Sequence, residues 1–114
     1  MAGPFHLNWT TQLRKGVLEL SILNALAGER LYGYEIVKRL ASVDSLVISE
    51  GTIYPILNRL KAEEYLETTI EESPEGPARK YYLLTERGRE QLSRMNGDWE
   101  RLQAGIDRLR KERT

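Results

Sequence analysis

The chain has 114 residues, no cysteine and one histidine, and its 17 basic side chains balance its 17 acidic ones. This length suits one small domain, and the lack of cysteine excludes disulfides and thiolate metal sites. No apolar run approaches the length of a membrane span, and residues 1–9 lack the pattern of a secretory signal. We therefore expect a cytoplasmic protein without a membrane partner.

A first helix is predicted over residues 11–27, after a flexible tail at residues 1–10. Its apolar residues fall on two sides, each at spacings of three and four. One stripe comprises Leu13, Gly16, Leu20, Leu23 and Ala27, and the other comprises Leu18, Ile22, Ala25 and Leu26. A helix that is apolar on two sides needs cover on both. Gly28 is placed as the residue that stops this helix.

A second helix over residues 32–41 buries Ile36, Val37 and Leu40, and residues 43–48 form the turn into a third helix. Ser49 is a good N-cap for the third helix, and Glu50 suits the positive end of its dipole. Helical spacing assigns the core side to Ile53, Ile56, Leu57 and Leu60. The outer face is left with Thr52, Tyr54, Pro55, Asn58 and Lys61.

Two extended runs follow, at residues 66–72 and 79–84, with a turn between them that reads Ser73-Pro74-Glu75-Gly76-Pro77. Three helices and a hairpin describe a winged helix-turn-helix, whose third helix enters the DNA major groove. The predicted fold class is therefore mainly α with a small β-hairpin (α+β). The winged helix-turn-helix would span residues 11–85, and a C-terminal dimerisation helix would span residues 86–114.

The net charge of zero counts against nucleic-acid binding, but the charge is unevenly distributed. Residues 63–76 hold 6 acidic and no basic side chains, whereas residues 77–114 hold 10 basic and 6 acidic ones. The acidic block would keep one side off phosphate while another side faces it with Lys38, Arg39, Arg59, Lys61, Arg79 and Lys80. The alternative is that these are ordinary solvated charges.

The last predicted helix begins after Thr85, a suitable N-cap, and carries an apolar seam. Its members are Leu92, Met95, Trp99, Leu102, Ile106 and Leu109, at alternating intervals of three and four. The seam is short for an isolated coiled coil, so we expect a homodimer that also buries the spare stripe of the first helix. The alternative folds both stripes back onto one chain.

Catalytic and metal chemistry find no support in the sequence. The single histidine, His6, lies in the expected tail, so neither a histidine-based triad nor a His/Cys metal cluster can form. The glycines form neither a phosphate loop nor a dinucleotide fingerprint. The sequence predicts a protein that is not an enzyme and that has no cofactor or metal site.

Three blocks of sequence together resemble the PadR family of bacterial transcriptional regulators. They are Leu31-Tyr32-Gly33-Tyr34-Glu35-Ile36, the run Ser49-Glu50-Gly51-Thr52-Ile53-Tyr54-Pro55-Ile56-Leu57, and Lys80-Tyr81-Tyr82-Leu83-Leu84-Thr85-Glu86-Arg87-Gly88. The short tail helix is similar to the smaller subgroup with a single C-terminal dimerisation helix. The resemblance implies a homodimeric winged-helix repressor that a small-molecule effector releases from its operator. One departure is Tyr65, where the family usually ends the third helix with glycine.

On double-stranded operator DNA, Thr52, Tyr54 and Asn58 are the candidates for groove contacts, since their side chains suit thymine methyls and adenine. Ser49 and the amides beside it would take a phosphate. Charge contacts would come from Lys38, Lys61, Arg79 and Lys80. Tyr54 has the alternative of packing half-buried under the wing, and Arg79 and Lys80 that of a solubilising hairpin tip. Beside Pro55, Gly51 either eases helix strain or lets the backbone approach phosphate.

Trp99 is large for a two-stranded seam, and Gly16 leaves space across from it. Because some PadR-like proteins hold flat aromatic molecules in such a gap, the resemblance implies a site for a planar aromatic effector, walled by Trp99, Leu13, Gly16, Leu20 and Gln103. The alternative is that Trp99 fills the space itself. For the protein as a whole, the alternative function is a winged-helix module that binds protein without binding DNA.

Overall fold

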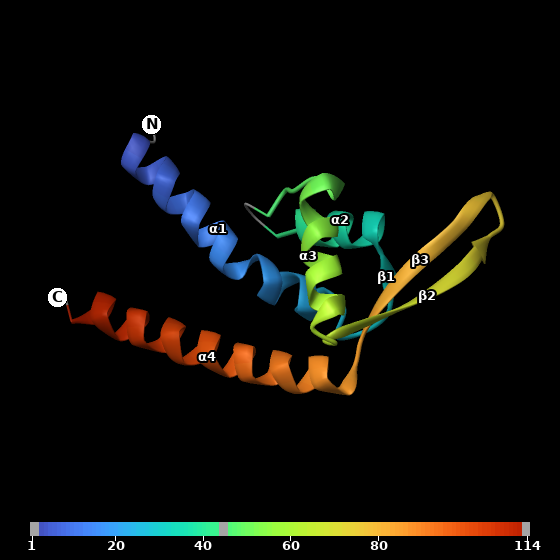
Figure 1. Ribbon diagram of the computed structural model, residues 1–114. Helices are drawn as coiled ribbons and strands as arrows, with labels where there is room; N and C mark the ends of the chain where they lie inside the picture. Colours follow the sequence, from blue (N-terminus) through green and yellow to red (C-terminus); the bar gives the residue numbers. More distant parts are fainter. Residues whose placement is uncertain (1–2, 44–45, 113–114) are drawn as a thin grey trace.

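The computed structural model describes residues 3–43 and 46–112, which form four α-helices and a three-stranded antiparallel sheet. In chain order the elements are α1 (Pro4–Ala25), β1 (Leu31–Tyr32), α2 (Gly33–Ala41), α3 (Glu50–Ala62), β2 (Leu66–Ser73), β3 (Gly76–Leu84) and α4 (Glu86–Lys111) (Figure 1). This arrangement confirms the predicted α+β fold class, a winged helix-turn-helix with a long C-terminal helix. Part of the predicted turn at residues 43–48 lies outside the described residues.

The sheet has the strand order β1-β3-β2, so the hairpin carries the short β1 on its inner edge. Leu31 pairs with Tyr82 and Tyr32 with Tyr81, while β2 and β3 pair from Leu66–Leu84 outward. Because neighbouring residues of a strand face opposite ways, Leu31 and Tyr82 lie on the core side, and Tyr32 and Tyr81 lie on the outer side. The sequence did not predict β1, since two residues are too few to show an alternating pattern.

The core joins α1, α2, α3 and the inner side of the sheet. Its buried side chains are Ile22, Leu23, Leu26, Leu31, Ile36, Leu40, Leu46, Ile53, Leu57, Leu60, Leu66, Tyr82, Leu84 and Leu92. The predicted core positions Val37 and Ile56 are only half-buried and pack against this cluster. Burial of each aliphatic side chain contributes roughly 1.5–3 kcal/mol, so α3 is held firmly by Ile53, Leu57 and Leu60.

The first helix begins at Pro4, so the prediction of a flexible tail is wrong for residues 4–10. Proline is suited to the first helical position because its φ angle is already helical and its missing N–H would have no partner there. The hydroxyls of Thr10 and Thr11 donate to the carbonyls of His6 and Leu7. The helix ends at Ala25, and Gly28 does not adopt a left-handed conformation, so the predicted glycine stop is also wrong.

The end of α3 explains how the chain manages without the family's glycine. Glu64 has a φ of 66°, whereas Tyr65 keeps a negative φ, so the left-handed residue lies one position before the expected one. The Glu64 N–H donates to the Lys61 carbonyl at 2.9 Å, and the Tyr65 N–H donates to the Leu60 carbonyl at 3.0 Å. These two bonds make a Schellman motif, which ends the helix without glycine at a cost in strain.

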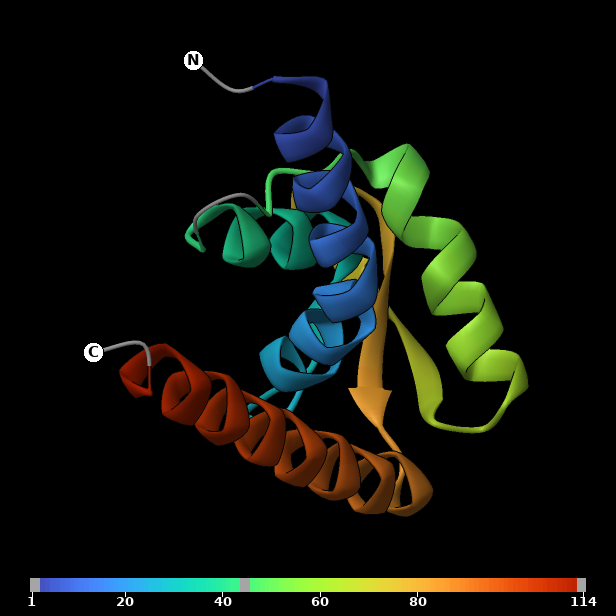
Figure 2. The ribbon, with the colours of Figure 1, turned by 90° about the vertical axis from the view of Figure 1, so that its left-hand side faces the viewer.

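Helices α1 and α4 leave the domain on the same side, away from the hairpin (Figure 1). They are joined where Asn24 and Asn96 exchange two hydrogen bonds of 3.0 Å between their amide groups. Beyond that point their ends lie apart, as the view onto the arms in Figure 2 shows. We call residues 4–16 of α1 and 99–111 of α4 the two arms.

The predicted seam on α4 divides between the core and the arm. Leu92 is buried in the core of its own chain and Met95 is half-buried against it, because the first turns of α4 pack on the domain. Trp99, Leu102, Ile106 and Leu109 are between 38% and 62% exposed. On the facing arm, Phe5, Leu7, Trp9 and Leu13 are likewise exposed. The alternative in which one chain covers both stripes is therefore excluded for these residues.

Candidate functional site

The outer face of α3 is built as the sequence predicts at its start. The Ser49 hydroxyl accepts from the Thr52 N–H at 3.2 Å, which confirms the N-cap, and Glu50 lies in the first turn. Thr52, Pro55, Asn58 and Lys61 are all exposed. The helix continues through Pro55, and a Cβ at Gly51 would meet only the Ser49 hydroxyl at 3.7 Å, so packing does not demand glycine there.

The ring of Tyr54 packs against the start of α2, a contact that the sequence did not predict. A Cβ on Gly33 would lie 2.7 Å from Cζ of the Tyr54 ring, so the ring fits only because position 33 has no side chain. The Tyr54 hydroxyl donates to Oε2 of Glu50 at 3.5 Å, and the ring remains 38% exposed. Burial raises the pKa of Tyr54, and Glu50 raises it further through its charge and this bond. Tyr54 therefore both braces α3 against α2 and presents an edge to solvent.

A cleft of about 380 Å³ opens between α3, the start of α2 and the hairpin. It brings together four of the predicted DNA-binding residues, Tyr54, Asn58, Arg79 and Lys80, and is completed by Tyr32, Gly33, Ala78 and Tyr82. Sequence reasoning missed Tyr82 as a site residue. Its alternation with Lys80 along β3 is the one sequence signal that could have placed it on the same side of the strand as a predicted site residue.

The basic side chains predicted to contact phosphate differ in whether they already contact another side chain of the chain. Lys80 is exposed at the rim of the cleft, and Lys61 is exposed in the last turn of α3. The Arg79 guanidinium lies 4.6 Å from the centre of the Tyr32 ring, and Lys38 lies 5.5 Å from that of Tyr34. Such contacts hold the charge near the surface without neutralising it.

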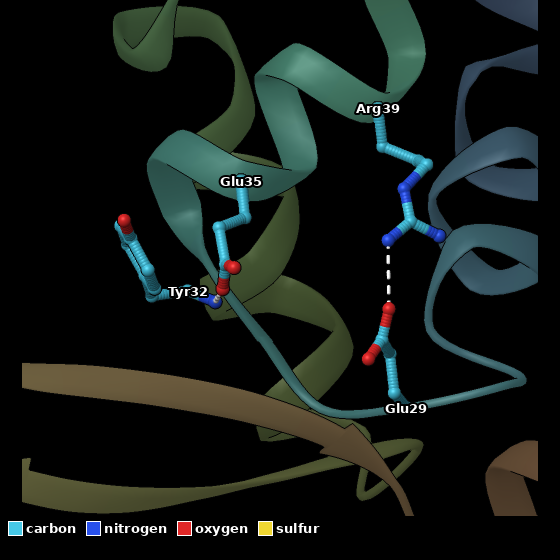
Figure 3. Close-up of polar contacts among 4 residues, drawn as sticks. All are labelled: Glu29, Tyr32, Glu35 and Arg39. Atoms are coloured by element: carbon cyan, nitrogen blue, oxygen red, sulfur yellow. Dashed lines mark hydrogen bonds and ion pairs between the residues drawn. The ribbon is translucent and has the colours of Figure 1, made fainter.

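Two further arginines that the sequence predicts to face phosphate form ion pairs within the chain and remain about half exposed. Arg39 donates to Glu29 at 2.7 Å and ties α2 to the turn after α1 (Figure 3). Arg59 pairs with Glu19 of α1. Figure 3 also shows the Glu35 carboxylate at the start of α2, where it accepts from the Tyr32 N–H at 3.2 Å.

The residues predicted to hold an effector lie on the two arms, except Leu20, which follows the arm of α1. Trp99, Leu13, Gly16 and Gln103 are exposed, Leu20 is half-buried, and a Cβ on Gly16 would meet nothing within 4 Å. Because the arms diverge within one chain, a closed cavity at these residues would need a second chain. Within residues 3–43 and 46–112, no three His, Cys, Asp or Glu side chains gather as a metal site would need. No helix in these ranges is long and apolar enough to span a membrane.

Comparison with known proteins identifies a matching family and several similar structures. Residues 22–94 match the transcriptional regulator PadR-like family. A PadR-like transcriptional regulator from Bacillus cereus strain ATCC 14579 is 40% identical, with a TM-score of 0.79 and coverage of 86% of this chain and 95% of that one. A PadR-like transcription factor from Bacteroides fragilis is 37% identical, with a TM-score of 0.74 and coverage of 90% and 98%.

A third solved structure is Bacillus subtilis PadR in complex with operator DNA. It is 27% identical to this chain, with a TM-score of 0.63, and the match covers 73% of this chain and 45% of that one. This chain therefore shares its winged-helix fold with a regulator whose structure was solved in complex with DNA.

Proposed function

The chain belongs to the PadR-like family of transcriptional regulators, and from that premise we propose that it is a sequence-specific, homodimeric repressor that binds operator DNA. A family of transcriptional regulators also confirms the prediction that the protein is not an enzyme. The observation that carries the proposal is the exposed polar face of α3, capped by Ser49 and flanked by the cleft with Lys80. The DNA-bound Bacillus subtilis PadR, which shares the fold, supports the same mode of action.

In this proposal Thr52 and Asn58 read base edges, because both are exposed on the outer face of the helix that enters the major groove. Tyr54 offers the exposed part of its ring, and Ser49 with the amide of Gly51 takes a phosphate at the helix start. Lys38, Lys61, Arg79 and Lys80 supply charge contacts that position the protein without reading sequence. Pro55 adds an apolar edge beside the base-reading residues.

The proposed homodimer follows from the uncovered apolar arms. Trp99, Leu102, Ile106 and Leu109 repeat along one side of α4 and are exposed in the single chain. A soluble chain rarely leaves so many large apolar side chains uncovered. A second copy with the same arms would cover them about a two-fold axis and carry two α3 helices on one duplex. Since Leu92 and Met95 pack on their own chain, the part of the predicted seam that a partner chain would cover begins at Trp99.

We also propose that a planar aromatic effector binds between the arms and releases the repressor. The walls would be Trp99, Leu13, Gly16, Leu20 and Gln103, whose surroundings are open in one chain. The test is quenching of tryptophan fluorescence in a variant with Trp9→Phe, so that the signal comes from Trp99. Quenching by flat apolar compounds, with loss of operator binding, is expected. If no compound of a broad panel quenches the fluorescence, the proposed site is absent and Trp99 only fills space between the arms.

DNA binding is tested by titration against the region upstream of the protein's own gene and against an unrelated duplex of equal length. The salt concentration must be low and equal in both, since phosphate contacts make affinity fall steeply with salt. We expect preferential binding to the upstream region. Asn58→Ala should reduce that preference by about tenfold, whereas Ser93→Ala, on α4, should not change it. Failure of the parent to bind either duplex would favour a module that binds protein.

A further inference from the structure

The side chain of Tyr82 stands out because its burial and its polarity do not match. It is 2% exposed, yet its hydroxyl has no hydrogen-bond partner among the described residues. Within the same residues, no side-chain nitrogen or oxygen is both inaccessible and unpaired. The hydroxyl therefore keeps a little accessible surface, and the opening that Tyr82 lines is the cleft between α3, α2 and the hairpin.

Some of the polar groups around this opening are already paired. The Tyr54 hydroxyl donates its proton to Glu50, and the Glu35 carboxylate accepts from the Tyr32 N–H. Arg79 lies over the Tyr32 ring, but this contact leaves its N–H groups free to donate. The Tyr82 hydroxyl and the Lys80 ammonium, which also line the cleft, can likewise donate hydrogen bonds.

We propose that this cleft is a docking site for one phosphodiester of the DNA backbone, with the Tyr82 hydroxyl as its buried anchor and Lys80 closing over it. A phosphodiester fits because it offers only acceptor oxygens and carries one negative charge. Gly33, the first residue of α2, opens into the cleft, so the positive end of that helix dipole also favours an anion. The inference rests on the proposed DNA binding.

Burial supports the role of the hydroxyl as a donor. It raises the pKa of Tyr82, and the neighbouring Tyr54 raises it further, so the phenol stays protonated and neutral at physiological pH. A hydrogen bond to an anion is charge-assisted, and a donor as little exposed as Tyr82 makes a stronger one than a donor at the open surface. Because phosphate is the same at every base pair, this contact would hold the register of α3 without reading sequence.

The test compares Tyr82→Phe with Tyr81→Phe. Each change removes one hydroxyl from neighbouring residues of β3, but Tyr81 lies on the outer side of the sheet, where its ring contacts Tyr32 and Arg30. Tyr82→Phe should weaken binding five- to tenfold, equally for the upstream duplex and the unrelated one. Its salt dependence should match that of the parent, because no charge is lost, whereas Lys80→Ala should lower the slope by about one unit. Tyr81→Phe should bind like the parent.

A second arm separates a phosphate contact from a structural effect. Neutral methylphosphonates are placed one at a time along the upstream duplex, and each is titrated with the parent and with Tyr82→Phe. At one phosphate in each half-site the loss caused by Tyr82→Phe should disappear, since that contact is already gone. The thermal unfolding midpoint of Tyr82→Phe should stay close to that of the parent.

Each remaining outcome has a clear meaning. Equal DNA affinity for Tyr82→Phe and a parent that binds DNA would overturn the anchor while leaving the proposed function intact. A loss that persists at every methylphosphonate, or a large fall in the unfolding midpoint, would also overturn it, because the hydroxyl would then act within the fold. A parent that binds no DNA would overturn the proposed function itself.

Discussion

At the scale of single residues, the packing of the Tyr54 ring on Gly33 links α3 to α2. The ring of Tyr54 rests where any other residue at position 33 would put a Cβ, so this packing holds in place a side chain that we propose contacts DNA. The contact joins the middle of the Leu31–Ile36 block to the Ser49–Leu57 block. Two of the three sequence blocks that carry the family resemblance are thus packed together in space.

Gly33→Ala should destabilise the chain by about 1–3 kcal/mol, because the new methyl group would displace the Tyr54 ring. In a Tyr54→Ala background the same change should cost almost nothing, since the obstacle is gone and alanine is the better helix former. Urea unfolding of the four proteins in this cycle measures the coupling. Equal costs in both backgrounds would show that the ring does not depend on Gly33.

At the scale of elements, the join between α3, the sheet and α4 is tightly bonded. The Thr85 hydroxyl donates to the Glu64 carbonyl at 2.7 Å and accepts from the Gly88 N–H at 2.9 Å, while the Thr85 N–H donates to the Tyr65 carbonyl at 3.1 Å. The end of α3 and the start of α4 are therefore one rigid corner. This corner sets the direction in which α4 leaves the end of α3.

Glu64→Gly should stabilise the protein by about 0.5–1 kcal/mol. Glycine adopts the left-handed conformation at the end of α3 without the Cβ strain that glutamate bears there, and part of this gain is lost to the greater freedom of glycine in the unfolded chain. Glu63→Gly is the matched control: its φ is −84°, so it should be neutral or destabilising. Chemical unfolding that found both variants equally stable would contradict this account of the helix end.

Gly88→Ala should destabilise the fold by about 2 kcal/mol or more. Its Cβ would press on the Tyr65 carbonyl oxygen and lie 3.1 Å from the carbonyl carbon, and the backbone there cannot move aside cheaply. Gly97→Ala, on the same helix, would meet only the movable Arg101 guanidinium at 3.4 Å and should be neutral or slightly stabilising. Thermal unfolding distinguishes the two, and similar midpoints would show that the corner is loose.

At the scale of the whole molecule, the shape explains why we propose two copies. The arms project to one side and the hairpin to the other, which separates the surface that we propose for a partner chain from the surface that we propose for DNA (Figure 1). Two reading heads on one duplex also raise affinity through effective concentration without any new contact. Dimerisation and operator binding should therefore be lost together.

Ile106→Glu should convert the protein to single chains in sedimentation at micromolar concentration while leaving each chain folded, because Ile106 is 48% exposed within its own chain. Affinity for the upstream duplex should fall by about a hundredfold or more as the second reading head is lost. Ile70→Glu, at an apolar position on the hairpin that is 70% exposed, should leave the oligomeric state unchanged. A parent protein that sediments as a single chain would overturn the proposed homodimer.

The sequence by itself determined what local chemistry controls. Periodicity located the helices and the hairpin, and side-chain chemistry identified the caps Ser49 and Thr85, since a cap bonds to an amide three residues away. The polar outer face of α3 followed from the same spacing. Only the tertiary structure decided which residues meet across the fold. It packs the Tyr54 ring against Gly33 and buries Leu92 in the core of its own chain. It also places Tyr82 in the lining of a cleft. Such contacts join residues far apart in the chain, and their partners depend on how the elements pack, which no short window of sequence contains.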